Sequence, residues 1–230
     1  MHILIIIIID NNLNGYLGLN TNKNHWYDGW FYDRMIAPNQ DTLFAQILDI
    51  IEKHKTIIDI GTGTGRFPFQ AAVKSGFITG IDLSERNINM AVKTLSKRGD
   101  KNILFEHASI NEVIKSGRHF DYAVMTYVIH EVDEDQRIEL LKESAEVADK
   151  VIIGDYLVPK PIGFWSILNE IVEFAAGSRH YRNYKNYTAN GGIHYLAEKA
   201  GLKIISEIKN RPSTSHLVVL EKLNGKNANQ

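Results

Sequence analysis

The 230-residue sequence has no cysteine and only five prolines. Without cysteine the chain forms no disulfide, no thiolate metal site and no cysteine nucleophile. It also lacks an excess of charge of either sign, because 26 basic residues stand against 27 acidic ones. This balance does not favour nucleic acid or an anionic membrane as the main partner. We expect no nucleic-acid partner and no metal site, and a cytoplasmic location fits the missing cysteines.

Long hydrophobic runs are also missing. The aliphatic run Ile3–Ile9 is much shorter than the roughly 20 residues of a membrane-spanning helix, so we expect no membrane span. No basic segment precedes it and no small-residue cleavage motif follows it, which argues against a signal peptide. An asparagine-rich stretch extends to Asn24. We therefore predict that residues 1–24 form a tail outside the fold and that residues 25–230 form a single domain.

From Asn39 onward, short apolar runs alternate with segments of helical periodicity, which predicts alternating strands and helices. The strands expected are Thr56–Ile60, Phe77–Leu83, Asn102–Glu106, Phe120–Val128, Val151–Tyr156, Leu202–Ile208 and His216–Leu223. The last two have no helical pattern between them, so we expect them to pair antiparallel. The sequence thus predicts an α/β fold, a Rossmann-like doubly wound seven-stranded sheet with an antiparallel last strand. A helical insertion is expected at about residues 160–190, after the fifth strand.

Glycines stand at alternate positions directly after the first expected strand, in the sequence Asp59-Ile60-Gly61-Thr62-Gly63-Thr64-Gly65. Glycine allows a tight turn and lets a ligand lie against the main chain. A dinucleotide-binding loop needs its third glycine where this chain has Arg66. The spacing therefore favours a ligand without a pyrophosphate.

Asp82 ends the second expected strand, where a carboxylate can accept hydrogen bonds from both hydroxyls of a ribose. The alternative is that Asp82 caps a turn or helix, but Ser84 is already in place to cap the next helix. We predict that Asp82 binds a ribose.

The glycine loop, Asp82, Phe120-Asp121 and the segment Ile129-His130-Glu131-Val132 resemble class I methyltransferases that depend on S-adenosylmethionine (SAM). The resemblance is strongest to the small-molecule group that includes the ubiquinone and menaquinone biosynthesis enzymes. It implies SAM as cofactor and S-adenosylhomocysteine (SAH) as product. The cofactor-binding residues that it implies are Asp59, Gly61, Thr62, Gly63, Thr64, Asp82, Leu83, Ser109, Ile110, Thr126 and Tyr127. Ser109 departs from the family, which usually has an acidic residue at the adenine, and a hydroxyl accepts more weakly than a carboxylate.

His130 follows the fourth expected strand on the ligand side of the sheet, and we predict that it is a general base. The alternatives are a helix-entry residue bonded to the backbone or a wall of the SAM pocket.

The segment 178–187 combines basic and aromatic residues, which can hold an anionic or planar acceptor. From it we predict catalytic roles for His180 and Tyr181, and acceptor binding by Arg179, Arg182 and Tyr184. The alternative for this segment is a solvated loop or helix face. Tyr27 and Tyr32 are further candidates, because similar proteins fold an N-terminal Tyr-Asp segment over the cofactor.

Two predictions concern helices. Asp133 and Gln136 have the spacing of a capping box. An apolar stripe in the expected insertion suggests ordinary core, with a lid over a hydrophobic acceptor as the alternative; its residues are Phe164, Trp165, Ile167, Leu168, Ile171 and Phe174.

The sequence therefore favours a SAM-dependent methyltransferase that acts on a small organic acceptor. Three alternatives stay open: a SAM-binding protein without turnover, a nucleotide-dependent oxidoreductase on the same fold, and a nucleic-acid methyltransferase. The last is disfavoured because no Asn/Asp-Pro-Pro-Tyr motif follows the fourth expected strand. The sequence identifies neither the methyl acceptor nor the oligomeric state.

Overall fold

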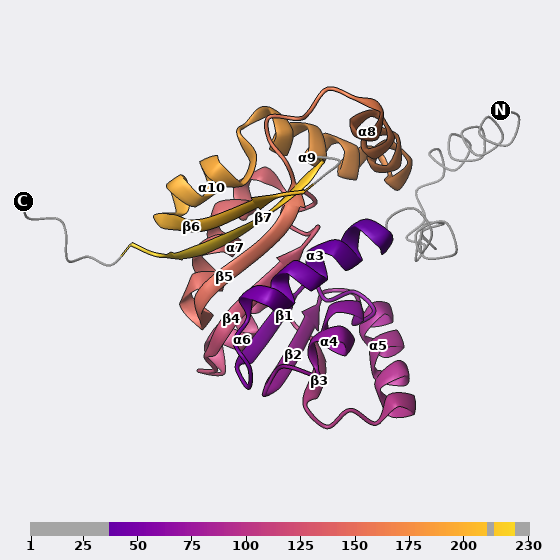
Figure 1. Ribbon diagram of the computed structural model, residues 1–230, viewed down its shortest axis with the longest axis vertical. Coiled ribbons are helices and arrows are strands. Elements are labelled where there is room, and N and C mark those ends of the chain that lie inside the picture. Colours follow the sequence, from indigo (N-terminus) through magenta and orange to yellow (C-terminus); the bar gives the residue numbers. More distant parts are fainter. Residues whose placement is uncertain (1–36, 211–213, 224–230) are drawn as a thin grey trace, which may run out of the picture.

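The computed structural model describes residues 37–210 and 214–223 (Figure 1). Its seven strands form one sheet in the order β3-β2-β1-β4-β5-β7-β6. The first five strands in this order are parallel, and β7 is antiparallel to both β5 and β6. This confirms the predicted Rossmann-like sheet. The strands are β1 (Thr56–Ile60), β2 (Phe77–Asp82), β3 (Ile103–His107), β4 (Phe120–Thr126), β5 (Ala148–Tyr156), β6 (Leu202–Lys209) and β7 (Ser215–Lys222). The predicted tail at residues 1–24, with Tyr27 and Tyr32, lies outside the described residues.

Helices cover both faces of the sheet. Figure 1 shows α3 crossing in front of the strands, with α7 behind them. The helices are α3 (Ala37–Ile50), α4 (Arg66–Ala71), α5 (Glu85–Arg98), α6 (Ile110–Lys115), α7 (Glu134–Val147), α8 (Phe164–Ala176), α9 (Ser178–Ala189) and α10 (Gly192–Ala200). Between β5 and α10, α8 and α9 form the predicted helical insertion.

Two large apolar clusters, and a smaller one between α5 and β3, fill the space between the helices and the sheet. On one face, α3 and α4 bury Leu43, Ile47 and Phe67 against the strands. On the other, α6, α7, α9 and α10 pack against residues such as Ile153 and Val218. Alternate residues of the strands face opposite layers, so a strand covered on both sides is apolar nearly throughout.

The order of the strands reverses at β1, which has β2 on one side and β4 on the other. The chain leaves β1 and β4 toward opposite faces of the sheet, which opens a crevice beyond the carboxyl ends of these two strands. The side chains that follow β1, β2, β4 and β5 therefore meet at one edge of the sheet. This edge is where the sequence predicts the ligand.

One helix start differs from the prediction. The Ser84 hydroxyl accepts a hydrogen bond from the N–H of Asn87 at 3.3 Å, which confirms the predicted cap of α5. The predicted capping box at Asp133 is wrong, because the Asp133 carboxylate makes no cap hydrogen bond and instead accepts from Arg179 and Asn183. Spacing alone missed this, since the competing donors come from a distant helix.

The apolar stripe of α8 is not ordinary core, so that prediction is also wrong. The exposed fractions of Phe164, Ile167 and Phe174 are 70%, 59% and 60%. The helix instead buries Ser166 and Glu173. Periodicity locates an apolar face of a helix but does not say whether another element covers it.

Arg137 on α7 forms hydrogen bonds both with α9 of the insertion and with the loop that follows β4. Its guanidinium donates to the main-chain oxygens of Val132, His130 and Asn183 and to the side-chain oxygen of Asn186, at 2.7–3.2 Å. Arg137 is almost fully buried. A rigid guanidinium can satisfy several acceptors at once, so it replaces water for a group of buried carbonyls.

No helix among the described residues is long and apolar enough to cross a membrane.

We predict that Arg137→Met lowers the free energy of unfolding by about 3 kcal/mol, because it leaves buried carbonyls without donors. Urea denaturation followed by circular dichroism measures this change. The matched control is Arg98→Met, which removes a surface ion pair with Asp100 and costs about 1 kcal/mol or less. Equal losses in the two variants would contradict the role of Arg137.

Candidate functional site

The glycine loop joins β1 to α4 and has positive φ at three positions: Gly61 (+72°), Gly63 (+56°) and Gly65 (+84°). A Cβ on Gly61 would lie 2.6 Å from Val128, and one on Gly65 would lie 2.5 Å from the Phe105 ring. A Cβ on Gly63 would meet nothing within 4 Å. The loop is therefore packed at its two ends and open at its middle glycine, where a ligand can lie against the main chain.

Asp82 ends β2 beside the loop. One of its oxygens accepts from the N–H of Gly63 and the other from the N–H of Ser84, each at 2.8 Å. An ionised carboxylate has about four lone-pair positions, so each oxygen can accept one more hydrogen bond. Asp82 thus positions the loop and still has acceptors for two hydroxyls.

Asp59, at the end of β1, is buried beneath the loop. Burial raises the pKa of its carboxyl to about 7. Thr62 in the loop is also closely packed, because a Cβ on Gly80 of the neighbouring strand β2 would lie 2.7 Å from the Thr62 hydroxyl oxygen. Asp59 and Thr62 therefore support the loop from below, while Thr64 is exposed at its rim.

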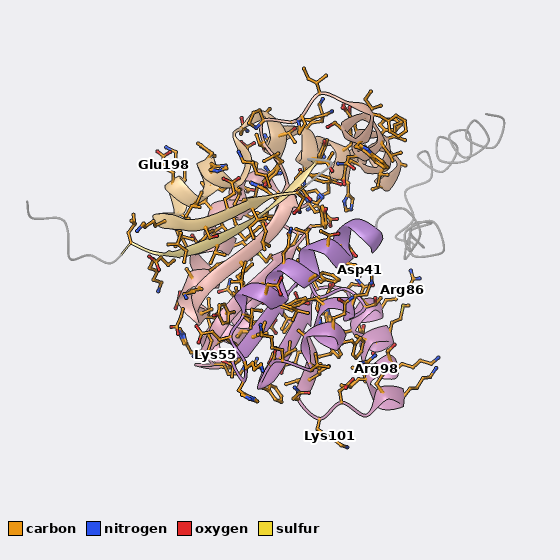
Figure 2. All side chains as sticks on the ribbon, viewed as in Figure 1. Asp41, Lys55, Arg86, Arg98, Lys101 and Glu198 are labelled. Carbon is orange, nitrogen blue, oxygen red and sulfur yellow. The ribbon has the colours of Figure 1, made fainter. Side chains whose placement is uncertain are left out.

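Arg66 occupies the position of the missing third glycine and points to α3. It donates to the Gln40 side-chain oxygen at 2.6 Å and to the Asp41 carboxylate at 2.9 Å. Figure 2 shows Asp41 on α3. The side chain thus joins α3 to the start of α4, which gives Arg66 a structural role where a dinucleotide-binding loop has glycine.

Of the residues predicted to lie near the adenine, Ser109 stands at the start of α6. The N–H and the hydroxyl of Ser109 both donate to the Glu112 carboxylate, at 2.7 and 2.9 Å. Ile110 is buried, with 6% exposed, whereas Leu83 after β2 is 77% exposed. Of these three predicted residues, Leu83 therefore offers the most open apolar surface to a ring.

Thr126 ends β4 beside the loop, and Tyr127 begins the turn that follows. Tyr127 has φ +56°, which is uncommon for a residue other than glycine and usually marks a constrained site. Its N–H donates to the Gly154 oxygen at 2.8 Å, and its ring packs edge-on against Tyr156 with centroids 5.4 Å apart. The turn after β4 is thereby held against β5.

His130 is buried at the end of this turn, with 2% exposed. Its Nδ1 lies 2.8 Å from an oxygen of Asp155, the penultimate residue of β5. Its Nε2 has no hydrogen-bond partner among the described residues and lies 3.6 Å from the Glu173 carboxylate of α8. The ring is thus oriented through Nδ1, whereas Nε2 faces the carboxylates of Glu173 and Glu131 without a hydrogen bond among the described residues.

Charge determines the protonation of His130. Burial alone would lower the pKa of the imidazole, but the carboxylates of Asp155 and Glu173 outweigh burial and raise this pKa above its usual value. Glu173 also accepts from the hydroxyl of Tyr156 at 2.7 Å. The two carboxylates therefore favour the protonated form of the imidazole.

The segment 178–187 forms α9, and its side chains divide between two faces. Tyr184 is buried near His130, with ring centroids 6.4 Å apart. His180 lies 3.8 Å from the Glu131 carboxylate, next to the same site. Arg179 pairs with Asp133, and Tyr181 donates to Glu170 at 2.8 Å; a further predicted acceptor-binding residue, Arg182, is exposed. Of the five predicted residues, the structure therefore brings His180 and Tyr184 nearest to His130.

Asp155 and Glu173 are site residues that the sequence reasoning missed. A signal existed for Asp155, because a lone carboxylate at the carboxyl end of an otherwise apolar strand repeats the pattern of Asp82. Glu173 lies within the apolar stripe of α8 and gave no comparable signal.

These residues fit SAM. The open main chain at Gly63 gives the ligand a place to lie, and the spare acceptors of Asp82 match two ribose hydroxyls. Nothing in the loop supplies the packing glycine that a pyrophosphate ligand requires at position 66.

Solved structures share the fold. The mitomycin 7-O-methyltransferase MmcR has a TM-score of 0.64 and 16% identity over 84% of this chain, which spans only 56% of that protein. PH0226 from Pyrococcus horikoshii OT3 has a TM-score of 0.63 and 16% identity, covering 83% of this chain and 92% of that one. The [4+2]-cyclase SpnF also matches, with a TM-score of 0.61 and 15% identity over 80% and 81% of the two chains. The fold therefore does not determine the reaction by itself.

Sequence comparisons are more specific. No curated protein matches the chain significantly. The sequence profile described as "Methyltransferase domain" matches residues 51–192, which is more than half of the chain and includes the glycine loop, Asp82, His130 and Asp155. The prediction of a methyltransferase is confirmed, whereas the finer resemblance to the ubiquinone and menaquinone enzymes stays a prediction. The chain belongs to the methyltransferase domain family.

Proposed function

We propose that this methyltransferase transfers a methyl group from SAM to a small organic acceptor that carries a dissociable proton, with His130 as the general base. SAM is the cofactor, as the sequence predicted, and it supplies a methyl group activated by its positively charged sulfur. The observation that carries the proposal is the 2.8 Å contact between His130 Nδ1 and Asp155 at the edge of the sheet that bears the glycine loop.

The cofactor half of the proposal rests on the loop and Asp82. The Gly63 N–H holds Asp82 in place, so the ribose acceptors are fixed before the ligand binds. Preorganised acceptors reduce the entropy lost on binding. The exposed side chain of Leu83, next to Asp82, can cover the adenine ring.

The catalytic half rests on how His130 is held. Asp155 fixes the ring and favours the tautomer with the proton on Nδ1, as an orienting carboxylate does in other histidine bases. In the neutral ring, whose share grows as the pH rises, Nε2 then has the lone pair that accepts the proton of the acceptor as the methyl group is transferred. In this arrangement His130 is the catalytic residue and Asp155 is a positioning residue.

The surroundings of His130 limit the access of water. The rings of Tyr156, Tyr184 and Tyr187 have centroids 4.8–6.4 Å from the imidazole centroid. Glu173 on α8 and His180 on α9 approach from the helical insertion. Alignment of the acceptor and exclusion of water are the main contributions that a protein makes to methyl transfer. We infer that α8 and α9 provide the acceptor side of the site.

Asp82→Asn tests the cofactor site. We predict a 10- to 100-fold weaker affinity for SAH by isothermal titration, because a charged acceptor of hydroxyl hydrogen bonds is worth about 1.5–3 kcal/mol. The control is Asp100→Asn, which removes a surface partner of Arg98 and should leave SAH affinity unchanged. Wild-type affinity in Asp82→Asn would contradict the ribose assignment.

A second prediction concerns the pH dependence of His130. Since the flanking carboxylates raise its pKa, the neutral imidazole becomes abundant only above the usual histidine range of about 6.5, and methyl transfer should increase with pH through that higher range. Asp155→Asn removes one carboxylate, so the titration should move to lower pH. Histidine-selective ¹⁵N NMR measures both pKa values without an acceptor.

Activity completes this test. SAH release with a panel of phenols, hydroxy acids and amines identifies an acceptor, and His130→Asn should then lower kcat by about 10²–10⁴-fold at unchanged SAH affinity. The control His119→Asn changes an exposed histidine paired with Asp149. SAH binding with unchanged turnover in His130→Asn would exclude the base role, and binding with no turnover of any acceptor would favour the SAM-binding alternative.

A further inference from the structure

A second group of titratable side chains lies outside the methyl-transfer site. It joins His194 of α10, Glu207 of β6 and His216 of β7. Glu207 lies between the two histidines, with one oxygen 2.7 Å from Nδ1 of His216 and the other 3.2 Å from Nε2 of His194. One donor atom from each residue lies within 4.8 Å of the other two.

The fold brings the three residues together. Lys209 pairs with His216 across β6 and β7, and Glu207 stands two positions before Lys209. Residues two apart share a face of a strand, so Glu207 and His216 point to the same side of the hairpin. Helix α10 packs against β6 and brings His194 to this face.

We propose that His194, Glu207 and His216 bind a divalent transition-metal ion, with Zn²⁺ the best match. Two imidazoles and one carboxylate are a common donor set for zinc, with water as the fourth ligand. Softer thiolate ligands are not available in this chain, which has no cysteine. Mg²⁺ and Ca²⁺ prefer oxygen-only sites and fit this set less well.

The distances suit such an ion. Donor atoms about 2.1 Å from a tetrahedral zinc ion lie about 3.4 Å apart. The contacts of Glu207, 2.7 Å through one oxygen and 3.2 Å through the other, are close to that spacing. The donor atoms lie within 4.8 Å of one another, so at most about 1.4 Å separates them from that spacing. His194 can supply this movement, because its side chain is 43% exposed while that of His216 is 1% exposed. The buried histidine fixes the site, and the exposed one completes it.

The protonation states are compatible with metal binding. Burial lowers the pKa of His216, so this imidazole is neutral at pH 7. Burial alone would raise the pKa of Glu207, but its contacts with His216 and His194 lower it overall, so the carboxylate is ionised. Neutral imidazole and ionised carboxylate are the forms that bind metal ions.

The location suggests what the ion does. A bound ion links α10 to the β6–β7 hairpin, which forms the antiparallel edge of the sheet. Figure 2 shows Glu198, further along α10, at the outer edge of the molecule. His216 also pairs with Asp155 across β5 and β7, so the ion stabilises the strand that bears the partner of His130. An ion that binds the native state better than the unfolded chain raises the melting temperature.

The experiment uses the full-length, tag-free protein after dialysis against EDTA. Co²⁺ serves as the spectroscopic probe, and we expect visible absorption bands that saturate at one equivalent and disappear when Zn²⁺ is added. Zn²⁺ should raise the melting temperature by several degrees. His194→Ala should weaken Co²⁺ binding at least 10-fold, and it changes an exposed side chain that the fold does not need.

Two measurements keep the result unambiguous. His119→Ala removes an exposed histidine far from the cluster in sequence and should bind Co²⁺ like the wild type. SAH affinity should be the same in His194→Ala and wild type, so this test is independent of the proposed methyl transfer. Absence of Co²⁺ bands, or equal Co²⁺ affinity in wild type and His194→Ala, would overturn the metal site.

Discussion

The hydrogen bond between His130 and Asp155 joins the turn after β4 to the end of β5, and much of the site is arranged around it. The two residues are 25 positions apart and both are buried. A buried carboxylate is costly unless it is paired and hydrogen-bonded. Asp155 meets this requirement by accepting from the imidazole and from the N–H of Tyr156. Arg137 holds the same turn from the other side through the His130 carbonyl. The position of the imidazole is thus fixed by β5, α7 and the turn together.

The cofactor edge of the sheet is held by a separate contact. The Gly63 N–H donates to the Asp82 carboxylate and so joins the ends of β1 and β2, and this contact needs no helix of the insertion. Separate sites for the methyl donor and the acceptor match the chemistry, because the two molecules must meet in line but are recognised independently. In the proposed function, the donor site lies on the parallel strands, whereas Glu173 of α8 and His180 of α9 belong to the acceptor side. Variation in the inserted helices can therefore change the acceptor without disturbing the cofactor site.

The sequence predicted the cofactor edge because its determinants are local. Glycine spacing, the end of a strand and a capping serine are all readable within the segment from Thr56 to Ser84. The place of His130 after β4 also predicts it as a candidate base, but nothing in the sequence predicts its contact with Asp155, because that contact depends on the pairing of β4 and β5. The stripe of α8 was misassigned, since an apolar helix face is the same in sequence whether covered or exposed. Likewise, the basic and aromatic segment divided between two faces of α9, with Tyr184 buried and Arg182 exposed.

The most direct test of the central claim is a crystal structure of the protein with SAH. We predict that the ribose hydroxyls lie within hydrogen-bond distance of the Asp82 carboxylate and that the main chain at Gly63 contacts the ligand. We also predict that the sulfur of the ligand faces His130 Nε2, with room for an acceptor between them. SAH bound away from Asp82 would contradict the proposed cofactor site, and SAH with its sulfur turned away from His130 would contradict the proposed role of this histidine.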